Sequence, residues 1–541
     1  NKITEVLEVG EGVIEVCEKH LDDVRMSKTI DYWELTDQLA DSVIILPQTP
    51  GFKIKSRIGP STIASSKKLR MEVYPDYARP SMTNEFTEEL NSISARQGSV
   101  KSFVKRKLIP DVEFSLFVDN YFKYDFNMMS DRFQKFPVGI NYEASVKWVQ
   151  EHNYPLMVGQ SLKELFDSGF EFNGISDIRV HGKIEQTTRM EKFSRWFNEV
   201  QTRSILASAY CISALFCPMF KTLKERFKDS LNGKVKYSDG MSPEQLSASL
   251  KHHGGVKFIV EDDLSKQDAA TTHLIIDVEF LIYIALGAST IDVSIYKWIH
   301  SRWRFRGKGF SGVWDAMRLT GQPTTALGNA ITNMVVHNRL FRANKTRIVC
   351  MYVLGDDNIL LCNTKIDVRN HGTITKELYN IVSKVKQSEG VGQYLAMLVY
   401  IKDGVVCLCP DIKRMRHRYA VCNYTFSKDD REEKLRSRRL SYCMMLGNVR
   451  QTRDWAMRKF NGVRVPDWYS VWDSICMASK YYEVSMTEIE QDLSMLVNMI
   501  IKDGYYMSET PQFQNSHKQS RNLIRIGMML NNMEIIRVGY E

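Results

Sequence analysis

The chain has 541 residues, of which 43% are hydrophobic and 25% charged, so we expect an ordinary globular protein with several lobes. Its 73 Lys and Arg residues against 64 Asp and Glu residues give a formal charge of +9, which favours a locally basic channel over a uniformly basic surface. No run of about 18 or more apolar residues occurs, so no membrane-spanning helix is predicted.

Ten cysteines are scattered along the chain without a CxxC pair, and they predict reduced, partly buried thiols in a cytosolic setting. Cys407 and Cys409, with His417 and Cys422 nearby, offer zinc-ligand chemistry, but their spacing suits a β-strand better than a common zinc site. The chain begins at Asn1 with no signal-peptide pattern, which predicts a processed product or an excised segment.

Four regions succeed one another along the sequence. Residues 1–80 mix short amphipathic pieces with turn-rich stretches, which predicts an N-terminal extension joined loosely to the rest of the chain. Residues 81–255 are rich in helical patterns and basic clusters, and in 256–425 strand-like apolar runs alternate with longer helical stretches. The last region, 426–541, is charged and helical. This succession predicts an α+β fold.

The first acidic segment, 256–263, has a short strand pattern that ends in Asp262 and Asp263. A turn then leads into a helix that carries Asp268. Asp263, at a strand end, can meet carboxylates from neighbouring strands. Asp268 would point toward the ligand bound at the face where these carboxylates meet. The alternative is an N-capped helix with Asp263 or Ser265 as the cap, a role that is compatible with metal binding.

The second segment, from Thr320 to Asn329, is a loop with Gly321 and a proline that runs into a helix. Such a loop lets a nucleic-acid backbone approach closely. Thr325 and Asn329 are four residues apart and therefore share one helix face. An ordinary N-cap at Thr324 or Thr325 is the alternative, but it leaves Asn329 unexplained.

Two apolar runs, 348–354 and 359–362, flank the tetrapeptide Gly355-Asp356-Asp357-Asn358, which predicts a strand–turn–strand hairpin. Adjacent carboxylates raise each other's pKa unless a cation neutralises them. The usual remedy is a pair of divalent metal ions, whose usual chemistry is phosphoryl transfer. With Asp263, the hairpin offers oxygen ligands for two Mg²⁺ ions. An exposed acidic turn is the alternative.

Taken in order, the three segments resemble motifs A, B and C of viral RNA-dependent RNA polymerases of the alphavirus-like supergroup. Asp263-x4-Asp268 is similar to motif A, Thr320-Gly321-x3-Thr325-x3-Asn329 to motif B, and Gly355-Asp356-Asp357-Asn358 to motif C. The sequences Leu-Ser-Lys-Gln-Asp and Thr-Gly-Gln-Pro-Thr-Thr are most similar to the kitavirus and negevirus branch. The resemblance is strong over about 180–425 and weak outside it.

The resemblance implies a right-hand polymerase with an antiparallel palm sheet and helix-rich fingers and thumb. Fingers, with part of the palm, would occupy 81–255. The palm would occupy 256–425, with a fingers insertion around 285–315, and the thumb 426–541.

Residue roles are implied by the same resemblance. Asp263 and Asp356 would bridge two Mg²⁺ ions, which Mn²⁺ can replace, with Asp357 helping less directly. Asp263 is preferred to the adjacent Asp262 because it keeps the four-residue spacing of motif A. The residues implied in selection of the ribose 2′-hydroxyl are Asp268, Thr325 and Asn329.

Weaker matches extend the set of implied site residues. Arg203, with Lys183 and Arg195, would bind the incoming nucleotide. Lys386 is a candidate general acid, in competition with Lys384. The residues implied in template and primer binding are Thr320, Gly321, Lys413 and Arg414. The segment 300–308 interleaves cations with aromatics, which favours either an aromatic-lined RNA channel or a charged amphipathic helix end with Trp303 and Phe305 buried.

The implied function is template-directed RNA synthesis by two-metal catalysis, in the replication of a positive-strand RNA virus genome. RNA template, RNA product and nucleoside triphosphates would be its ligands. Relatives work with other replicase domains, including a helicase and a capping enzyme, in replication complexes on host cytoplasmic membranes. A reverse transcriptase shares the palm, but its hairpin usually reads aromatic-x-Asp-Asp and its sugar gate is bulky. A non-catalytic RNA-binding scaffold is the third alternative, and the intact aspartates argue against it.

Overall fold

The protein is represented by a computed structural model. It describes 52–56, 70–73, 81–82, residue 93, 108–170, 177–182, 185–186, 204–502 apart from short gaps at 266, 308–309, 316–317, 425–426 and 461–462, and 506–507. The helices before residue 302 are α4 (Pro110–Tyr121), α5 (Phe126–Phe133), α6 (Tyr142–Glu151), α7 (Leu156–Asp167), α8 (Tyr210–Ser230), α9 (Pro243–Lys251), α10 (Gln267–Ala270), α11 (His273–Ala285) and α12 (Thr290–Ser301). Later helices are α13 (Thr325–Val336), α14 (Asn338–Ala343), α15 (His371–Tyr379), α16 (Ile412–Tyr419), α17 (Lys428–Met445), α18 (Arg450–Lys459), α19 (Val471–Tyr482) and α20 (Met486–Lys502).

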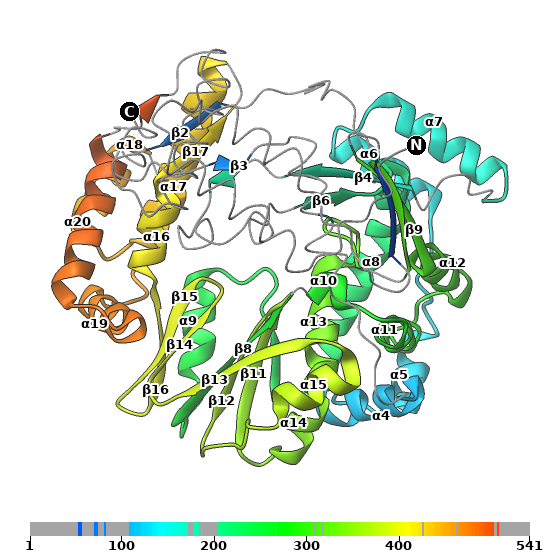
Figure 1. The fold of residues 1–541 in the computed structure, drawn as a ribbon, viewed down its shortest axis with the longest axis horizontal. Coiled ribbons are helices and arrows are strands. Elements are labelled where there is room, and N and C mark those ends of the chain that lie inside the picture. The colour runs from blue at the N-terminus through cyan, green and yellow to red at the C-terminus, as the bar shows by residue number, and fades with distance from the viewer. Residues whose placement is uncertain are drawn as a thin grey trace, which may run out of the picture.

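A five-stranded sheet, the central sheet, carries the acidic segments. Its strand order is β13 (Val382–Ser388), β8 (Phe258–Ser265), β12 (Asp357–Cys362), β11 (Ile348–Leu354) and β7 (Val235–Tyr237). Neighbouring strands are antiparallel except for β11 and β7, which are parallel. In Figure 1 this sheet lies in the lower part of the molecule, beside α13.

The two faces of the central sheet pack against different cores. Val260 and Leu264 of β8 belong to a hydrophobic core that includes side chains of α11 and α13, and we call this the α face. Ile259 belongs to a second core with side chains of β14 (Val391–Tyr394), β15 (Met397–Lys402) and β16 (Val405–Pro410), and we call this the β face. Because successive side chains of a strand alternate between faces, a shift of one residue exchanges one core for the other.

A second five-stranded sheet lies apart from the central sheet. Its strand order is β1 (Phe52–Ser56), β10 (Phe310–Asp315), β9 (Arg302–Arg306), β4 (Asp177–Gly182) and β6 (Ser204–Ala207). The segment around 285–315 therefore forms α12 and a hairpin that joins strands from the region 81–255. Helices α16 to α20 gather on the opposite side of the molecule from α6, α7 and α12 (Figure 1).

The cation-rich segment 300–308 runs from the end of helix α12 into strand β9, and its two aromatic rings are buried, as the second alternative expected. Trp303 and Phe305 are fully buried, whereas Arg302, Arg304 and Arg306 are exposed on the other face of the strand. The arginines pair with carboxylates, with Arg304 Nε 2.8 Å from Asp177 Oδ1. The prediction of aromatic side chains that line an RNA channel is therefore wrong at this place, because the hydrophobic alternation of the strand turns both rings into the core.

Two segments of the region predicted as an N-terminal extension take part in sheets. Strand β1 pairs with β10, and β2 (Arg70–Val73) pairs with both β17 (Val421–Tyr424) and β18 (Tyr506–Met507). A further small sheet joins β3 (Ser81–Met82) to β5 (Glu185–Gln186). These pairings connect 52–56 and 70–73 to distant parts of the sequence.

The described chain is thus a mixed α/β protein whose sheets are mostly antiparallel, which is compatible with the predicted α+β class. Among the described helices, none combines the length and the hydropathy needed to cross a membrane.

Candidate active site

The Gly-Asp-Asp segment forms the turn of the β11–β12 hairpin. Leu354 pairs with Asp357, so Gly355 and Asp356 are the two central residues of the turn. Gly355 has a φ of +60°, a backbone conformation that a two-residue hairpin turn requires at its first central position and that glycine adopts freely. Asn333 of α13 donates a hydrogen bond from Nδ2 to the carbonyl oxygen of Asp356, at 3.1 Å. The helix thus fixes the tip of the hairpin, where the Asp356 side chain is exposed.

Asp262 and Asp263 point to opposite faces of β8. Asp262 is 4% exposed and lies on the α face, where it contacts His337 and His371. Asp263 is exposed on the β face. In the register of β8 and β12, Ile359 is opposite Glu261, so two residues further on Asp357 comes toward Asp263. Residues opposite each other in such a pair have Cβ atoms about 4.5–5.5 Å apart.

Asp357 lies in a negatively charged, partly buried position. Its Oδ2 accepts a hydrogen bond from the backbone N–H of Leu395 at 2.8 Å. Burial, helped by the charges of Asp356 and Glu261, raises the pKa of Asp357 to about 6, although the Leu395 hydrogen bond and the charge of Arg414 act in the opposite direction. The carboxylates of this region therefore destabilise one another electrostatically, as expected of a cation-binding site.

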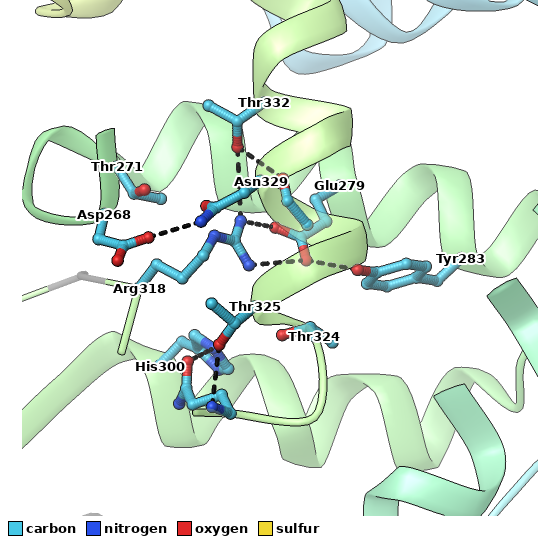
Figure 2. Close-up of polar contacts among 12 residues, drawn as sticks. Asp268, Thr271, Glu279, Tyr283, His300, Arg318, Thr324, Thr325, Asn329 and Thr332 are labelled. Carbon is cyan, nitrogen blue, oxygen red and sulfur yellow. Dashed lines mark hydrogen bonds and ion pairs between the residues drawn. The ribbon is translucent and has the colours of Figure 1, made fainter. Parts of the chain in front are cut away.

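Asp268 and Asn329 are joined by a hydrogen bond from Asn329 Nδ2 to Asp268 Oδ1, at 2.7 Å (Figure 2). Burial and the charge of Asp356 raise the pKa of Asp268, against the effects of Asn329 and of the positive charge of Arg318. The coupling to Asp356 connects this pair to the hairpin carboxylates. Gln267 donates from Nε2 to the backbone carbonyl of Asn329 at 2.7 Å, so it locks α10 onto α13.

Thr325 stabilises the loop before α13. Its hydroxyl donates to the carbonyl oxygen of Leu319 at 2.7 Å and accepts from the backbone N–H of Gln322 at 2.9 Å. Both bonds are to the loop that contains Thr320 and Gly321, whose φ is +86°. Thr325 therefore holds the loop conformation one turn before Asn329.

A buried ion pair that the sequence did not reveal lies behind Asn329. Arg318 and Glu279 form a two-pronged pair with side chains 1% and 2% exposed, and Tyr283 donates to Glu279 Oε1 at 2.5 Å (Figure 2). A Cβ on Gly328 would clash with the Arg318 guanidinium, so a larger residue at this turn of α13 would displace the ion pair. The backbone N–H of Arg318 also donates to the carbonyl oxygen of Asp268, at 3.2 Å.

Residues 192–391 match the family described as RNA dependent RNA polymerase. The non-structural polyprotein pORF1 of avian hepatitis E virus is 23% identical over 264 residues, 46% of this chain and 16% of the polyprotein. RNA-directed RNA polymerase 2a of olive latent virus 2 is 25% identical over 214 residues, 39% of this chain and 26% of that protein. RNA-directed RNA polymerase 2a of tobacco streak virus is 29% identical over 160 residues, 29% of this chain and 19% of that protein.

The chain spans about a quarter or less of the length of these relatives. The matches support an RNA-directed RNA polymerase of the alphavirus-like kind, and hence a nucleotidyltransferase. The matches thus confirm the predicted function as an RNA-directed RNA polymerase, without its viral branch. The aligned relatives include larger viral polyproteins. The kitavirus and negevirus branch remains a prediction.

Two lysines of β13 lie opposite acidic residues of β8. Lys384 is opposite Asp263, and Lys386 is opposite Glu261. Lys386 Nζ lies 3.8 Å from Glu261 Oε1 and 4.6 Å from the ring centre of Tyr481. Lys386 therefore lies beside Glu261, whereas Lys384 lies opposite Asp263, a predicted metal ligand.

Thr320 and Gly321, predicted to contact RNA, lie in the loop before α13 that Thr325 holds, and the other predicted contacts lie elsewhere. Lys413 and Arg414 lie in the first turn of α16. Lys413 forms an ion pair with Glu488, and Arg414 Nη1 lies 3.2 Å from Gln393 Oε1. The predicted nucleotide-binding residues lie outside the described part of the chain: Lys183, Arg195 and Arg203.

The three predicted metal ligands offer oxygen donors only, and the charge of Asp356 acts against ionised Asp357, an effect that a cation would relieve. They do not form a preformed cage. Within the described residues, one group of three His, Cys, Asp or Glu side chains has its ligand atoms all within 4.8 Å of one another, and that group is Asp262, His337 and His371.

Proposed function

We propose that the chain transfers ribonucleotides to the 3′-hydroxyl of an RNA strand, directed by an RNA template. One observation carries this proposal. The strand end with Asp263, the hairpin with Asp356 and Asp357, and the Asp268–Asn329 pair come from three segments that the comparison matches to one polymerase family, and they are neighbours in the fold. The test is incorporation of ribonucleotides by the purified chain on a primed RNA template of defined sequence. Incorporation that ignores the template sequence would contradict the proposal.

Asp263, Asp356 and Asp357 would hold two divalent ions, with Mg²⁺ as the natural pair and Mn²⁺ as a substitute. When bound, such ions lower the pKa of the attacking hydroxyl and neutralise charge on the phosphates. The contribution of the chain itself is to position the carboxylates. Asn333 holds the hairpin tip and Leu395 holds Asp357, so two of the three ligands lie on a backbone that is fixed in place.

Asp268 and Asn329 would read the ribose 2′-hydroxyl, which both donates and accepts hydrogen bonds. Asn329 Oδ1 is buried without a hydrogen-bond partner, which leaves an acceptor beside the paired Nδ2. A substrate hydroxyl at this place would satisfy it. Thr325 would support the reading indirectly, since its hydroxyl is occupied by the loop.

Asn329→Ala is expected to reduce the preference for ribonucleotides over deoxyribonucleotides by about two- to tenfold, which corresponds to one hydrogen bond between neutral groups. Single-nucleotide incorporation, measured for both sugars, checks this. Asn363→Ala is the matched control, because Asn363 donates to Thr346 at the other end of the sheet. An unchanged sugar preference in Asn329→Ala would remove Asn329 from the selection of ribose. A preference for deoxyribonucleotides in the unmodified chain would favour a reverse transcriptase.

Lys384 is the better candidate for protonating the leaving pyrophosphate, because it is opposite Asp263 while Lys386 pairs with Glu261. Lys384→Met should lower the rate of incorporation by about 10²- to 10⁴-fold, the usual worth of a general acid. Lys386→Met is the matched variant on the same face of β13, and its effect should be much smaller. A reversal of this order would return the role to Lys386, as the sequence alone suggested.

The arrangement in Figure 1 supports a right-hand layout. We assign the palm to the central sheet with α13 and α15, the fingers to the sheet β1-β10-β9-β4-β6 with its helices, and the thumb to α17 to α20. In this assignment the hairpin β9–β10 is the fingers insertion, because it pairs with β4. Thr320, Gly321, Lys413 and Arg414 would then face template and primer.

We also propose the partner domains, the location and the viral branch of this chain. The relatives include viral polyproteins, so this chain would act beside other replicase domains, such as a helicase and a capping enzyme, in membrane-associated complexes in the host cytoplasm. The kitavirus and negevirus branch is the source that its motif sequences favour.

A further inference from the structure

Two histidines converge on Asp262 beneath the central sheet, on the face turned away from the proposed catalytic carboxylates. His337 follows the last residue of α13, and His371 is the first residue of α15. The Nε2 atoms of both rings lie 3.2 Å from the same oxygen, Asp262 Oδ2. All three side chains are buried, with exposures of 4%, 0% and 4% for Asp262, His337 and His371.

The hydrogen bonding of His337 leaves a lone pair directed at this cluster. Its Nδ1 lies 2.7 Å from the carbonyl oxygen of Asn333, which can only accept, so Nδ1 carries the hydrogen. In the neutral ring, Nε2 is then unprotonated. That atom is buried and lacks a hydrogen-bond partner, although it lies near the Asp262 carboxylate. A lone pair that faces a carboxylate in a buried site is unfavourable, and either a proton on Nε2 or a bound cation would relieve it.

Protonation of both rings is a costly alternative. The ring centres are 4.8 Å apart, so two imidazolium ions would repel each other at short range.

The spacing fits a tetrahedral metal ion. Zinc bonds to imidazole nitrogen and carboxylate oxygen are about 2.0–2.2 Å long, which places ligand atoms about 3.3 Å apart in a tetrahedron. The two Nε2–Oδ2 distances of 3.2 Å match this edge. The Nδ1–H bond of His337 to a backbone carbonyl is the outer contact that orients metal-bound histidines. Ser383 Oγ, 2.7 Å from both carboxylate oxygens, is a further oxygen at the site.

We propose that Asp262, His337 and His371 form a structural zinc site, distinct from the Mg²⁺ site proposed on the other face of β8. Two imidazoles and one carboxylate suit Zn²⁺, whereas Mg²⁺ and Ca²⁺ prefer oxygen ligands alone. The site connects β8, the end of α13 and the start of α15, and Ser383 adds β13. A metal ion at this site stabilises β8 at Asp262, the residue directly before Asp263.

Metal analysis of the chain, purified without chelators and with zinc supplied, tests the site independently of any activity. About one Zn²⁺ per chain is expected, and His337→Gln and His371→Gln should each lose most of it. Cys407→Ser is the control, because it removes a thiol of the alternative zinc set suggested by the sequence, and its zinc content should equal that of the unmodified chain. An unmodified chain without zinc, or histidine variants that keep it, would overturn the proposal.

A second measurement needs no variant, and therefore does not depend on whether the substitutions fold. Co²⁺ in place of Zn²⁺ should give the intense visible absorption bands of a four-coordinate site, and added Zn²⁺ should abolish them. A zinc-selective chelator should also lower the Tm of the chain in the presence of excess Mg²⁺. Weak octahedral cobalt bands together with an unchanged Tm would show that the cluster is a metal-free hydrogen-bonded group, contrary to the proposal.

Discussion

Asp356→Ala is expected to reduce nucleotide incorporation by at least about a thousandfold, because metal-assisted charge stabilisation is worth several kcal/mol and each ~1.4 kcal/mol is a factor of ten. The folded structure should survive the change. The Asp356 side chain is exposed, and the contact that fixes the hairpin tip uses its backbone carbonyl, which alanine retains. Primer extension with Mg²⁺ and with Mn²⁺ measures the incorporation rate. Thermal unfolding of the variant and of the unmodified chain measures their stability.

Asp367→Ala is the matched control for this substitution. Asp367 is an exposed aspartate whose partner is the neighbouring Arg369, away from the hairpin. Its removal should leave incorporation unchanged. If Asp356→Ala extends primers at the rate of the unmodified chain, Asp356 is not a ligand of a catalytic metal.

Arg318→Met is expected to destabilise the chain by about 3–5 kcal/mol, because it leaves the carboxylate of Glu279 buried without its cationic partner. Tyr283 alone cannot neutralise that charge. Urea unfolding, followed through the midpoint of the transition, checks this prediction. The sugar preference should fall as well, since the positive charge of Arg318 acts on the Asp268 carboxylate and is lost in the variant.

Two further variants separate the ion pair from simple loss of packing. Arg318→Met combined with Glu279→Gln should recover part of the stability, because no unpaired charge then remains. Arg369→Met removes an exposed arginine of similar size and should leave the midpoint nearly unchanged. If the double variant is as unstable as Arg318→Met, packing rather than charge explains the loss.

The hairpin and the strand that carry the aspartates could be predicted because their signals are local. Apolar runs on either side of Gly355 specify two strands, and the glycine permits the turn between them. Asp263 was preferred to Asp262 because of the motif spacing. Side chains of β8 alternate between the two faces of the sheet, so a shift of one residue would place the carboxylate on the wrong face. The odd-numbered side chain faces the hairpin carboxylates, and the even-numbered one enters the α face.

The buried polar groups could not be predicted, because their partners are distant in sequence. Arg318 and Glu279 are 39 residues apart, and His371 lies 109 residues after Asp262. Each residue on its own resembles a solvated charge or an ordinary histidine, and only packing shows the partner. The predicted RNA channel after residue 300 was wrong for a related reason. Alternating cations and aromatics are typical of a half-buried strand as well as of an RNA-binding surface.

Anomalous diffraction at the manganese edge, from crystals of the chain with Mn²⁺, a primed RNA template and a non-reactive nucleotide, tests the central claim most directly. The proposed function predicts two peaks about 3.5–4 Å apart, bounded by Asp263 and Asp356. Manganese that binds elsewhere, with Asp263 and Asp356 free of metal in a complex that holds RNA and nucleotide, would contradict it.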